Sequence, residues 1–320
     1  MLCHLWHPVH SAIGIALPSN LMHLGECGAK CLTHDGWLTS VWLTSVWLTT
    51  QSSLLFLLVF PCSMVLHRPT DDPLTPPSAN RDRAHRESNV NSKVSPWLSA
   101  IAYPLGNRLL LPAYFGAIEV HGQHYLPKEG PVILAPLHRA RWDALLVPHV
   151  TGPSVTGRFP RFMVTADEVK GLQGWFIRRL GGFPVNPRQP GIASLRFGLE
   201  LLQQGEMLVI FPEGGIFRDQ LVHPLKPGLA RLALQAEQSQ PDLGVQVVPI
   251  HLRYDEPLPH WGCHVSIHIG PPIQVKPYLQ ESPKQGAKRL TADLRHALEC
   301  LSPVSAAQDL VVAHESEMAA

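Results

Sequence analysis

The sequence predicts an α/β fold in which helices cover a mixed sheet. Short runs rich in β-branched and apolar residues alternate with longer segments of helical periodicity, the pattern typical of such folds. The runs expected to form strands are 132–135, 162–165, 207–211, 245–250 and 265–269. The segments expected to form helices are 173–180, 192–204, 228–238 and 283–301. In the last of the strands, apolar residues alternate with polar ones, so we expect one of its faces to meet solvent or a covering loop.

Length, charge and cysteine content narrow the class of protein. The 320 residues are enough for one large domain or two small ones, and a net charge of +1 gives no general attraction to nucleic acid. Of the six cysteines, only Cys263 and Cys300 lie in the part that carries the motifs described below, which indicates no disulfide framework there. We therefore expect a reducing, cytosolic setting.

Residues 1–94 differ from the remainder of the chain. The run Trp-Leu-Thr-Ser-Val at 37–41 is repeated directly after itself, and its period of five matches neither a helix nor a strand. We interpret this stretch as a disordered lead, or as repetitive sequence translated upstream of the true start, for which Met64 is a candidate. Residues 1–63 are then expected to be dispensable. Residues 70–91, rich in Pro, Asp, Arg and Asn, are expected to be a solvated linker.

A membrane anchor is the alternative for this first segment. No Asp, Glu, Lys or Arg occurs from 36 to 66, and 54–60 is strongly apolar. Ser, Thr, Gln and a proline dilute the stretch, whereas a membrane span needs about 20 mostly apolar residues. A zinc site at Cys27, Cys31 and His34 is a further alternative, but no fourth ligand is placed convincingly.

An ordered domain is expected over 95–301, followed by a flexible tail at 302–320. The domain opens with an amphipathic helical segment whose apolar residues recur at spacings of three and four. These residues are Trp97, Leu98, Ile101, Leu105, Leu109 and Leu110. Such a helix either packs on the core or lies along a membrane interface, where aromatic-rich amphipathic stretches are common.

His138 and Asp143 form the candidate catalytic pair. They follow the apolar run 132–136 and precede another at 144–147, so His138 is expected on the turn where a strand ends. Residues five apart on a straight helix point roughly 140° away from each other, so the pair can meet only if His138 precedes the helix. Asp143 would then hold one ring nitrogen and leave the other free to act as a general base. From these residues alone, a chance pairing and a metal pair remain alternatives.

Three further motifs follow in order along the chain. They are Gly182-Phe183-Pro184-Val185-Asn186-Pro187-Arg188, Phe211-Pro212-Glu213-Gly214-Gly215 and Val248-Pro249-Ile250. Together with His138-x4-Asp143, this set resembles the four motifs of the glycerolipid acyltransferases, which include the bacterial 1-acylglycerol-3-phosphate acyltransferases. The resemblance covers residues 95–300 and implies a fold like that of the glycerol-3-phosphate and lysophosphatidate acyltransferases.

The resemblance also implies substrate-binding roles. Arg188 would bind a phosphate, which an arginine fork can hold bidentately. Glu213 would hold Arg188 or a glycerol hydroxyl, while Gly214 and Gly215 would offer backbone N–H groups to an anion or oxyanion. The simpler alternatives are a surface arginine and a plain turn with a solvated glutamate. Residues 248–250 are expected to be structural, lining the acyl path at most.

The sequence departs from the family pattern at positions that bear on recognition of the acceptor. Gly215-Ile216-Phe217-Arg218 stands where relatives continue with Thr-Arg-Ser, and Pro187 replaces an acid. Ala166-Asp167-Glu168 aligns with a lysine-rich stretch. Even so, the segment 158–196 contains seven Lys or Arg residues and only two acidic residues. This local excess suits anionic headgroups or the phosphates of a carrier.

The function implied is O-acyl transfer, with His138 as base and Asp143 orienting it. A fatty acyl group would pass from acyl-CoA or acyl carrier protein to the free hydroxyl of 1-acylglycerol-3-phosphate, giving phosphatidic acid in phospholipid synthesis. No metal or organic cofactor is implied. The partners expected are the acyl donor, lysophosphatidic acid and a membrane lipid surface at the cytoplasmic face, with no nucleic acid. The alternatives are another lysolipid or hydroxyl acceptor, a thioester hydrolase, and a catalytically inactive lipid-binding module.

Overall fold

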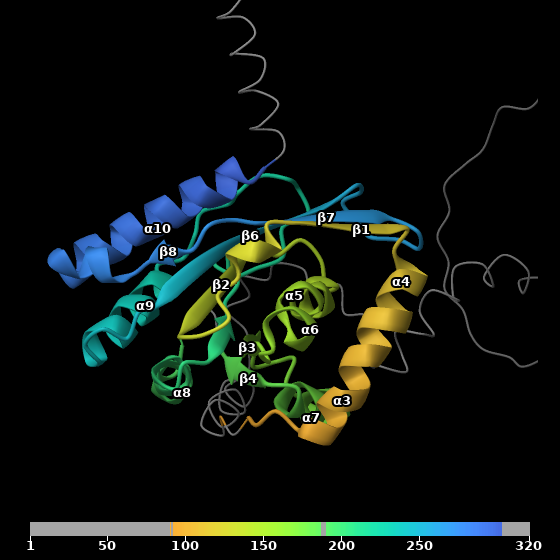
Figure 1. The fold of residues 1–320 in the computed structure, drawn as a ribbon, viewed down its shortest axis with the longest axis horizontal. Helices are drawn as coiled ribbons and strands as arrows, with labels where there is room; N and C mark the ends of the chain where they lie inside the picture. Colours follow the sequence, from red (N-terminus) through yellow and green to blue (C-terminus); the bar gives the residue numbers. More distant parts are fainter. Residues whose placement is uncertain (1–89, 91, 187–189, 303–320) are drawn as a thin grey trace, which may run out of the picture. The chain divides into compact units, whose positions relative to one another are not determined.

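A mixed eight-stranded sheet organises the part of the chain that the structure, a computed structural model, describes: residues 90, 92–186 and 190–302 (Figure 1). Its strands are β1 (Ala117–His121), β2 (Val132–Pro136), β3 (Arg161–Thr165), β4 (Gly182–Val185), β5 (Met207–Val209), β6 (Gln246–Tyr254), β7 (His264–Ile269) and β8 (Ile273–Gln274). Their order is β1-β7-β6-β2-β5-β3-β4, with β8 paired to β6. β7 and β8 run antiparallel to β6, whereas the other pairs are parallel. The predicted mixed α/β fold is confirmed.

The predicted strands are confirmed, with some of their ends shifted. β2, β3 and β7 match within one residue, and β7 alternates buried and more accessible positions as expected. β5 ends earlier than predicted, at Val209, and β6 continues beyond the predicted end to Tyr254. Besides the two-residue strand β8, the edge strand β1 was not predicted. Its five residues are all half-buried or exposed, so they carry little of the apolar pattern that marks a strand.

Helices cover both faces of the sheet through two apolar clusters. All five residues of β2 are buried, which explains its continuous apolar run. Val132 and Leu134 of β2 pack with side chains of α5 (Asp143–Thr151) on one face. Ile133 and Ala135 pack on the other face with side chains of α8, α9 and α10. These three helices span Ile192–Gln203, Gly228–Ser239 and Pro283–Cys300, within two residues of the predicted limits.

The first helical segment of the described chain runs along the domain as α3 (Pro96–Leu105), a π-helical turn (Gly106–Leu110) and α4 (Leu111–Tyr114). The predicted apolar stripe divides between two sides of it. Leu98 and Leu110 are buried, whereas four side chains are 45% to 60% exposed: Trp97, Ile101, Leu105 and Leu109. None of the helices in the described residues is both long and apolar enough to cross a membrane.

The remaining short elements connect the strands. They are η2 (Gln123–Tyr125), α6 (Pro153–Thr156), α7 (Gly171–Arg179) and η3 (Lys276–Gln280). Of these only α7 was predicted from the sequence. The predictions made for residues 1–89, which include the repeat, the anchor, the zinc site and Met64, lie outside the described residues, as does the tail from 303 onwards.

Candidate active site

The carboxyl ends of three neighbouring strands bring the candidate residues together. β2, β5 and β6 are adjacent and parallel, so the chain leaves all three at the same edge of the sheet. His138 follows β2, Glu213 follows β5, and Tyr254 ends β6. In open α/β sheets, ligands bind just beyond the carboxyl ends of the strands, which is where these residues lie.

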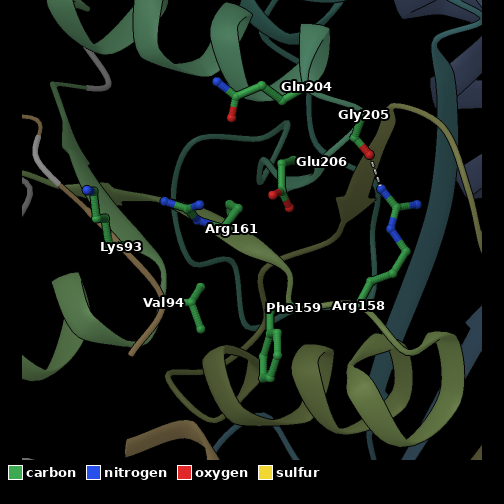
Figure 2. A pocket seen from close by; sticks show the side chains of 8 residues that line it. All are labelled: Lys93, Val94, Arg158, Phe159, Arg161, Gln204, Gly205 and Glu206. Carbon is green, nitrogen blue, oxygen red and sulfur yellow. Dashed lines mark hydrogen bonds between the residues drawn. The ribbon is translucent and has the colours of Figure 1, made fainter. Parts of the chain in front are cut away.

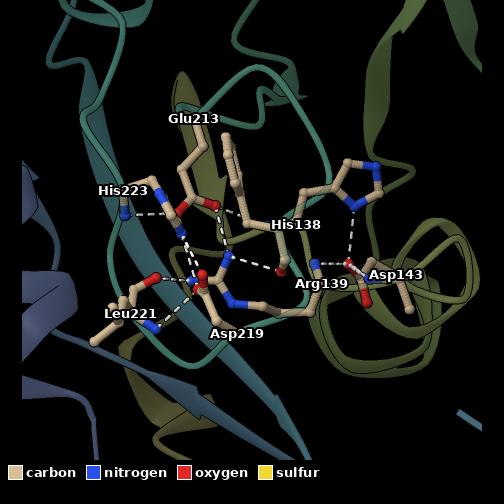
Figure 3. Close-up of polar contacts among 9 residues, drawn as sticks. His138, Arg139, Asp143, Glu213, Asp219, Leu221 and His223 are labelled. Atoms are coloured by element: carbon tan, nitrogen blue, oxygen red, sulfur yellow. Dashed lines mark hydrogen bonds and ion pairs between the residues drawn. The ribbon is translucent and has the colours of Figure 1, made fainter. Parts of the chain in front are cut away.

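His138 and Asp143 are in direct contact (Figure 3). His138 Nδ1 lies 2.8 Å from Asp143 Oδ2, the contact that the five-residue spacing predicted. α5 begins at Asp143, so His138 lies on the turn before the helix. Because an ionised carboxylate only accepts hydrogen bonds, this contact assigns the proton of a neutral imidazole to Nδ1. Nε2 is then free to accept a proton from a substrate hydroxyl.

The carboxylate of Asp143 is fully buried and surrounded by donors. Oδ2 accepts hydrogen bonds from the backbone N–H groups of Arg139 at 2.6 Å and Ala140 at 2.9 Å. Oδ1 accepts one from the hydroxyl of Tyr254 at 2.6 Å. These contacts leave the carboxylate little freedom to rotate, and they explain how a charged group is tolerated without exposure to water.

The ring of His138 is also held from outside this turn. Phe211 stacks on it, with ring centroids 4.1 Å apart and planes at 23°. The backbone N–H of Phe217 donates to the carbonyl of His138 at 2.9 Å. The His138 side chain keeps 20% of its surface exposed. The ring is therefore fixed in position and still reachable by a substrate, which its proposed role as base requires.

A buried ion pair joins the turn of His138 to the turn after β5. Arg139 Nη1 lies 2.8 Å from Glu213 Oε2, and the side chains are 4% and 0% exposed. Arg139 Nη2 donates to the carbonyl of Leu221 at 2.8 Å. His251 lies buried nearby, and burial, followed by the charge of Arg139, lowers its pKa to about 4, so it stays neutral. Arg139 was not predicted from the sequence to belong to the site.

Glu213 uses both carboxylate oxygens within the protein. Oε2 accepts from Arg139 and, at 3.4 Å, from the backbone N–H of His138, while Oε1 accepts from the backbone N–H of His223 at 3.0 Å (Figure 3). A plain turn with a solvated glutamate, the simpler alternative, is therefore wrong. The proposed contact between Glu213 and Arg188 stays a prediction, because residues 187–189 lie outside the described part of the chain.

The glycine turn after Glu213 is only partly available to an anion. Gly214 has a φ of +69°, a conformation that favours glycine. Its N–H donates to the carbonyl of Phe211 at 3.1 Å, so this group is used within the turn. A Cβ added at Gly214 would lie 2.5 Å from Nζ of Lys226, which places that amine directly over the turn. Anion binding by the N–H of Gly215 stays a prediction.

The motif at 248–250 lies inside β6, where all three residues are buried. The carbonyl of Ile250 accepts from the N–H of Leu137, the residue before His138, at 3.0 Å. This motif therefore supports the turn of the candidate base, in agreement with the structural role expected for it. Within residues 90, 92–186 and 190–302, no three His, Cys, Asp or Glu side chains are grouped so that they could hold a metal ion.

The described residues also form a cavity of about 510 Å³, whose lining side chains are shown in Figure 2. Its lining includes Arg158 and Arg161 near the start of β3, and Glu206 just before β5, at the opposite ends of the strands from His138. Arg158 donates to the carbonyls of Gly130 and Gly205, and Arg161 to those of Ser92 and Gly181. Two members of the basic excess between 158 and 196 thus support loops, and the cavity does not include the candidate pair.

Comparison with known proteins identifies the domain that carries this site. Residues 117–253 match the family model described as acyltransferase. These residues belong to the acyltransferase family. The acyltransferase domain contains His138, Asp143, Glu213 and the motif at 248–250.

The chain is similar to two curated bacterial proteins that share the name 1-acyl-sn-glycerol-3-phosphate acyltransferase. The one from Streptococcus pneumoniae is 25% identical over 177 residues, which cover 52% of this chain and 60% of the relative. The one from Bacillus subtilis is 25% identical over 119 residues, covering 37% of this chain and 57% of the relative. The chain therefore spans about three fifths of the length of these relatives.

A solved structure is also similar to this chain. It is the 1-acyl-sn-glycerophosphate (LPA) acyltransferase PlsC from Thermotoga maritima, which aligns over 70% of this chain and 88% of its own, with a TM-score of 0.48 and 20% sequence identity.

Proposed function

We propose that this protein is an O-acyltransferase that acylates the free hydroxyl of 1-acylglycerol-3-phosphate, with acyl-CoA or acyl carrier protein as donor, and forms phosphatidic acid. The observation that carries the proposal is the contact of His138 with the buried carboxylate of Asp143, inside a domain of the acyltransferase family. The two bacterial relatives are named for acylation of this acceptor, which supports the choice of substrate.

The proposed reaction needs one base and no covalent intermediate on the protein. Nε2 of His138 takes the proton of the acceptor hydroxyl as its oxygen attacks the carbonyl carbon of the thioester. The tetrahedral intermediate collapses, the C–S bond breaks, and the imidazolium returns the proton to the leaving thiolate. Asp143 holds Nδ1–H and stabilises the imidazolium between these two steps. An ester and a free thiol are the products.

Labelled acyl donor incubated with the purified full chain tests the proposal. We expect labelled phosphatidic acid only when lysophosphatidic acid is present, with either acyl-CoA or acyl carrier protein as the preferred donor. Release of free fatty acid without an acceptor would instead indicate a thioester hydrolase. Product formed equally well from several uncharged alcohols would mean that the acceptor has been assigned wrongly. No turnover of either donor would overturn the proposal.

Recognition of the acceptor phosphate is assigned to Arg188. Arg188→Ala should raise the KM for lysophosphatidic acid by about 10- to 150-fold, because a hydrogen bond to a charged group is lost. The KM for the acyl donor should change little. Arg188→Lys should recover only part of the loss, since an ammonium cannot reproduce the bidentate fork. Steady-state kinetics with lysophosphatidic acid and with a neutral monoacylglycerol measure the effect.

The matched control for this substitution is Arg196→Ala. Arg196 is an exposed member of the same basic excess and lies on α8. Its removal should leave the KM for lysophosphatidic acid nearly unchanged. If Arg188→Ala raises the KM equally for the charged and the neutral acceptor, Arg188 does not bind the phosphate of the acceptor.

Membrane contact is proposed for the exposed apolar face of α3 and for α7 beside it, with the cytoplasmic leaflet as partner. On α7, Leu172 and Trp175 are 64% and 38% exposed, and Trp175 lies 6.5 Å from Trp97 of α3 between ring centroids. The guanidinium of Arg179 lies 4.6 Å above the ring of Trp175. Apolar side chains bordered by aromatic rings and cations suit the headgroup region of an anionic bilayer.

Ile101→Asp should weaken binding to anionic lipid vesicles by about tenfold or more, since a side chain that is 60% exposed in water would otherwise be buried in the bilayer. Co-sedimentation with vesicles of phosphatidylcholine and phosphatidylglycerol measures this effect. Ile192→Asp is the control, because Ile192 is 79% exposed but lies on α8, which covers the other face of the sheet. Equal losses for both variants would count against a membrane face on α3.

A further inference from the structure

Asp143 carries its charge in a site where neutral groups do most of the stabilising. The carboxylate is 0% exposed. Of its side-chain and backbone donors, only His138 can become a cation in contact with it, because the guanidinium of Arg139 is turned away towards Glu213 at 2.8 Å. The two backbone N–H groups and the ring of His138 all contact Oδ2. Oδ1 therefore depends on a different group.

That group is the hydroxyl of Tyr254, at the end of β6. Its oxygen lies 2.6 Å from Asp143 Oδ1, and the residue is only 6% exposed. A short hydrogen bond from a hydroxyl to a buried carboxylate is of the charge-assisted kind, roughly twice as strong as a neutral one. Burial, followed by the negative charge of Asp143, raises the pKa of Tyr254 far above its usual value. The phenol therefore remains protonated and remains a donor.

The position of this hydroxyl is set by the scaffold. The backbone of Tyr254 is paired with Val265 of β7, and its ring lies 6.2 Å from that of Phe115 between centroids. The ionisable groups whose charges act on Tyr254 are Asp143, Cys263 and Tyr114. Cys263 is buried, and burial raises the pKa of its thiol, so it stays neutral. Burial also raises the pKa of Tyr114, so its phenol stays protonated. Among these three groups, Asp143 alone presents a charge to the phenol of Tyr254.

We propose that Tyr254 is a positioning residue for the reaction, which holds the second oxygen of Asp143 so that the first stays directed at Nδ1 of His138. This inference rests on the proposed acyl transfer. Without the hydroxyl, Oδ1 would have no side-chain or backbone donor among the residues that the structure describes, and rotation towards another donor would draw Oδ2 away from His138. Tyr254 touches no substrate in this role and acts only through Asp143.

The first test compares two tyrosines that make the same kind of contact. Tyr278 donates to Asp293 Oδ2 at 2.6 Å and is 7% exposed, but it belongs to the apolar cluster on the other face of the sheet. Tyr254→Phe should lower kcat by about 10- to 100-fold while both KM values change by less than about twofold. Tyr278→Phe should leave kcat unchanged and lower only thermal stability. Equal kcat for the two variants would overturn the proposal.

A double-mutant cycle separates positioning from general support. In protein that already carries Asp143→Asn, Tyr254→Phe should reduce the residual rate by less than about threefold, because its route through the carboxylate is gone. A loss as large as that in the wild-type background would show that Tyr254 acts through something else. The outcomes also stay apart from those of the proposed function, since a wild-type protein without acyl transfer refutes that function before any variant is compared.

Discussion

His138→Ala should lower kcat for acyl transfer by about 10²–10⁴-fold, the usual contribution of a general base. The fold should survive, because the His138 side chain is one-fifth exposed. Asp143 Oδ2 would keep the backbone donors of Arg139 and Ala140, so no carboxylate oxygen is orphaned by the change. Initial rates at saturating donor and acceptor, together with thermal melting of the same preparations, measure both effects.

Two further variants accompany His138→Ala, one expected to cause a similar loss and one as a control. Asp143→Asn should cost nearly as much, because an amide carries no charge to stabilise the imidazolium. His149→Ala is the control: it removes another half-buried histidine, further along α5, whose pKa is lowered by burial. It should leave kcat within about threefold of wild type, as expected for a residue outside the site. Folded His138→Ala protein with near-normal turnover would contradict the mechanism.

The His138–Asp143 contact was predictable from the sequence because its geometry is local. Both residues lie between an apolar run and a helix start, and helix geometry alone required the turn between them. Two other side-chain contacts of the site join residues that are far apart in the sequence. Tyr254 contacts Asp143 across 111 positions, and Glu213 contacts Arg139 across 74. Periodicity and spacing give no signal for contacts of this kind, since sheet order decides them.

The strands and helices, too, were predictable only where the signal is local. The strands that pack on both faces, such as β2, have continuous apolar runs and were predicted. β1 was missed because it lies at the edge, and its pairing with β7 joins Ala117 to His264. The apolar stripe of α3 was expected to face one side. In the structure, Leu98 is buried against the domain, whereas Ile101 is exposed. The spacing of apolar residues alone does not distinguish a buried position from an exposed one on the same helix.

Breaking the Arg139–Glu213 pair should cause the largest loss of stability. In Arg139→Met, the Glu213 carboxylate would stay buried with the backbone donors of His138 and His223 but without the guanidinium. A buried charge deprived of its partner costs about 3–5 kcal/mol of unfolding free energy. For a domain of this size, each kcal/mol lowers Tm by about 2–4 °C. Urea denaturation followed by circular dichroism measures the change.

A control substitution and a second substitution that should rescue stability test this prediction. Arg141 pairs with Glu168 at 3.3 Å, but its side chain is 50% exposed, and such pairs contribute about 0–1 kcal/mol. Arg141→Met should therefore be mild. Adding Glu213→Met to Arg139→Met should restore part of the stability, because the unpaired buried charge is removed, although the N–H groups of His138 and His223 lose their acceptor. If Arg139→Met is no worse than Arg141→Met, the buried pair does not hold the turn after β5 against the turn of His138.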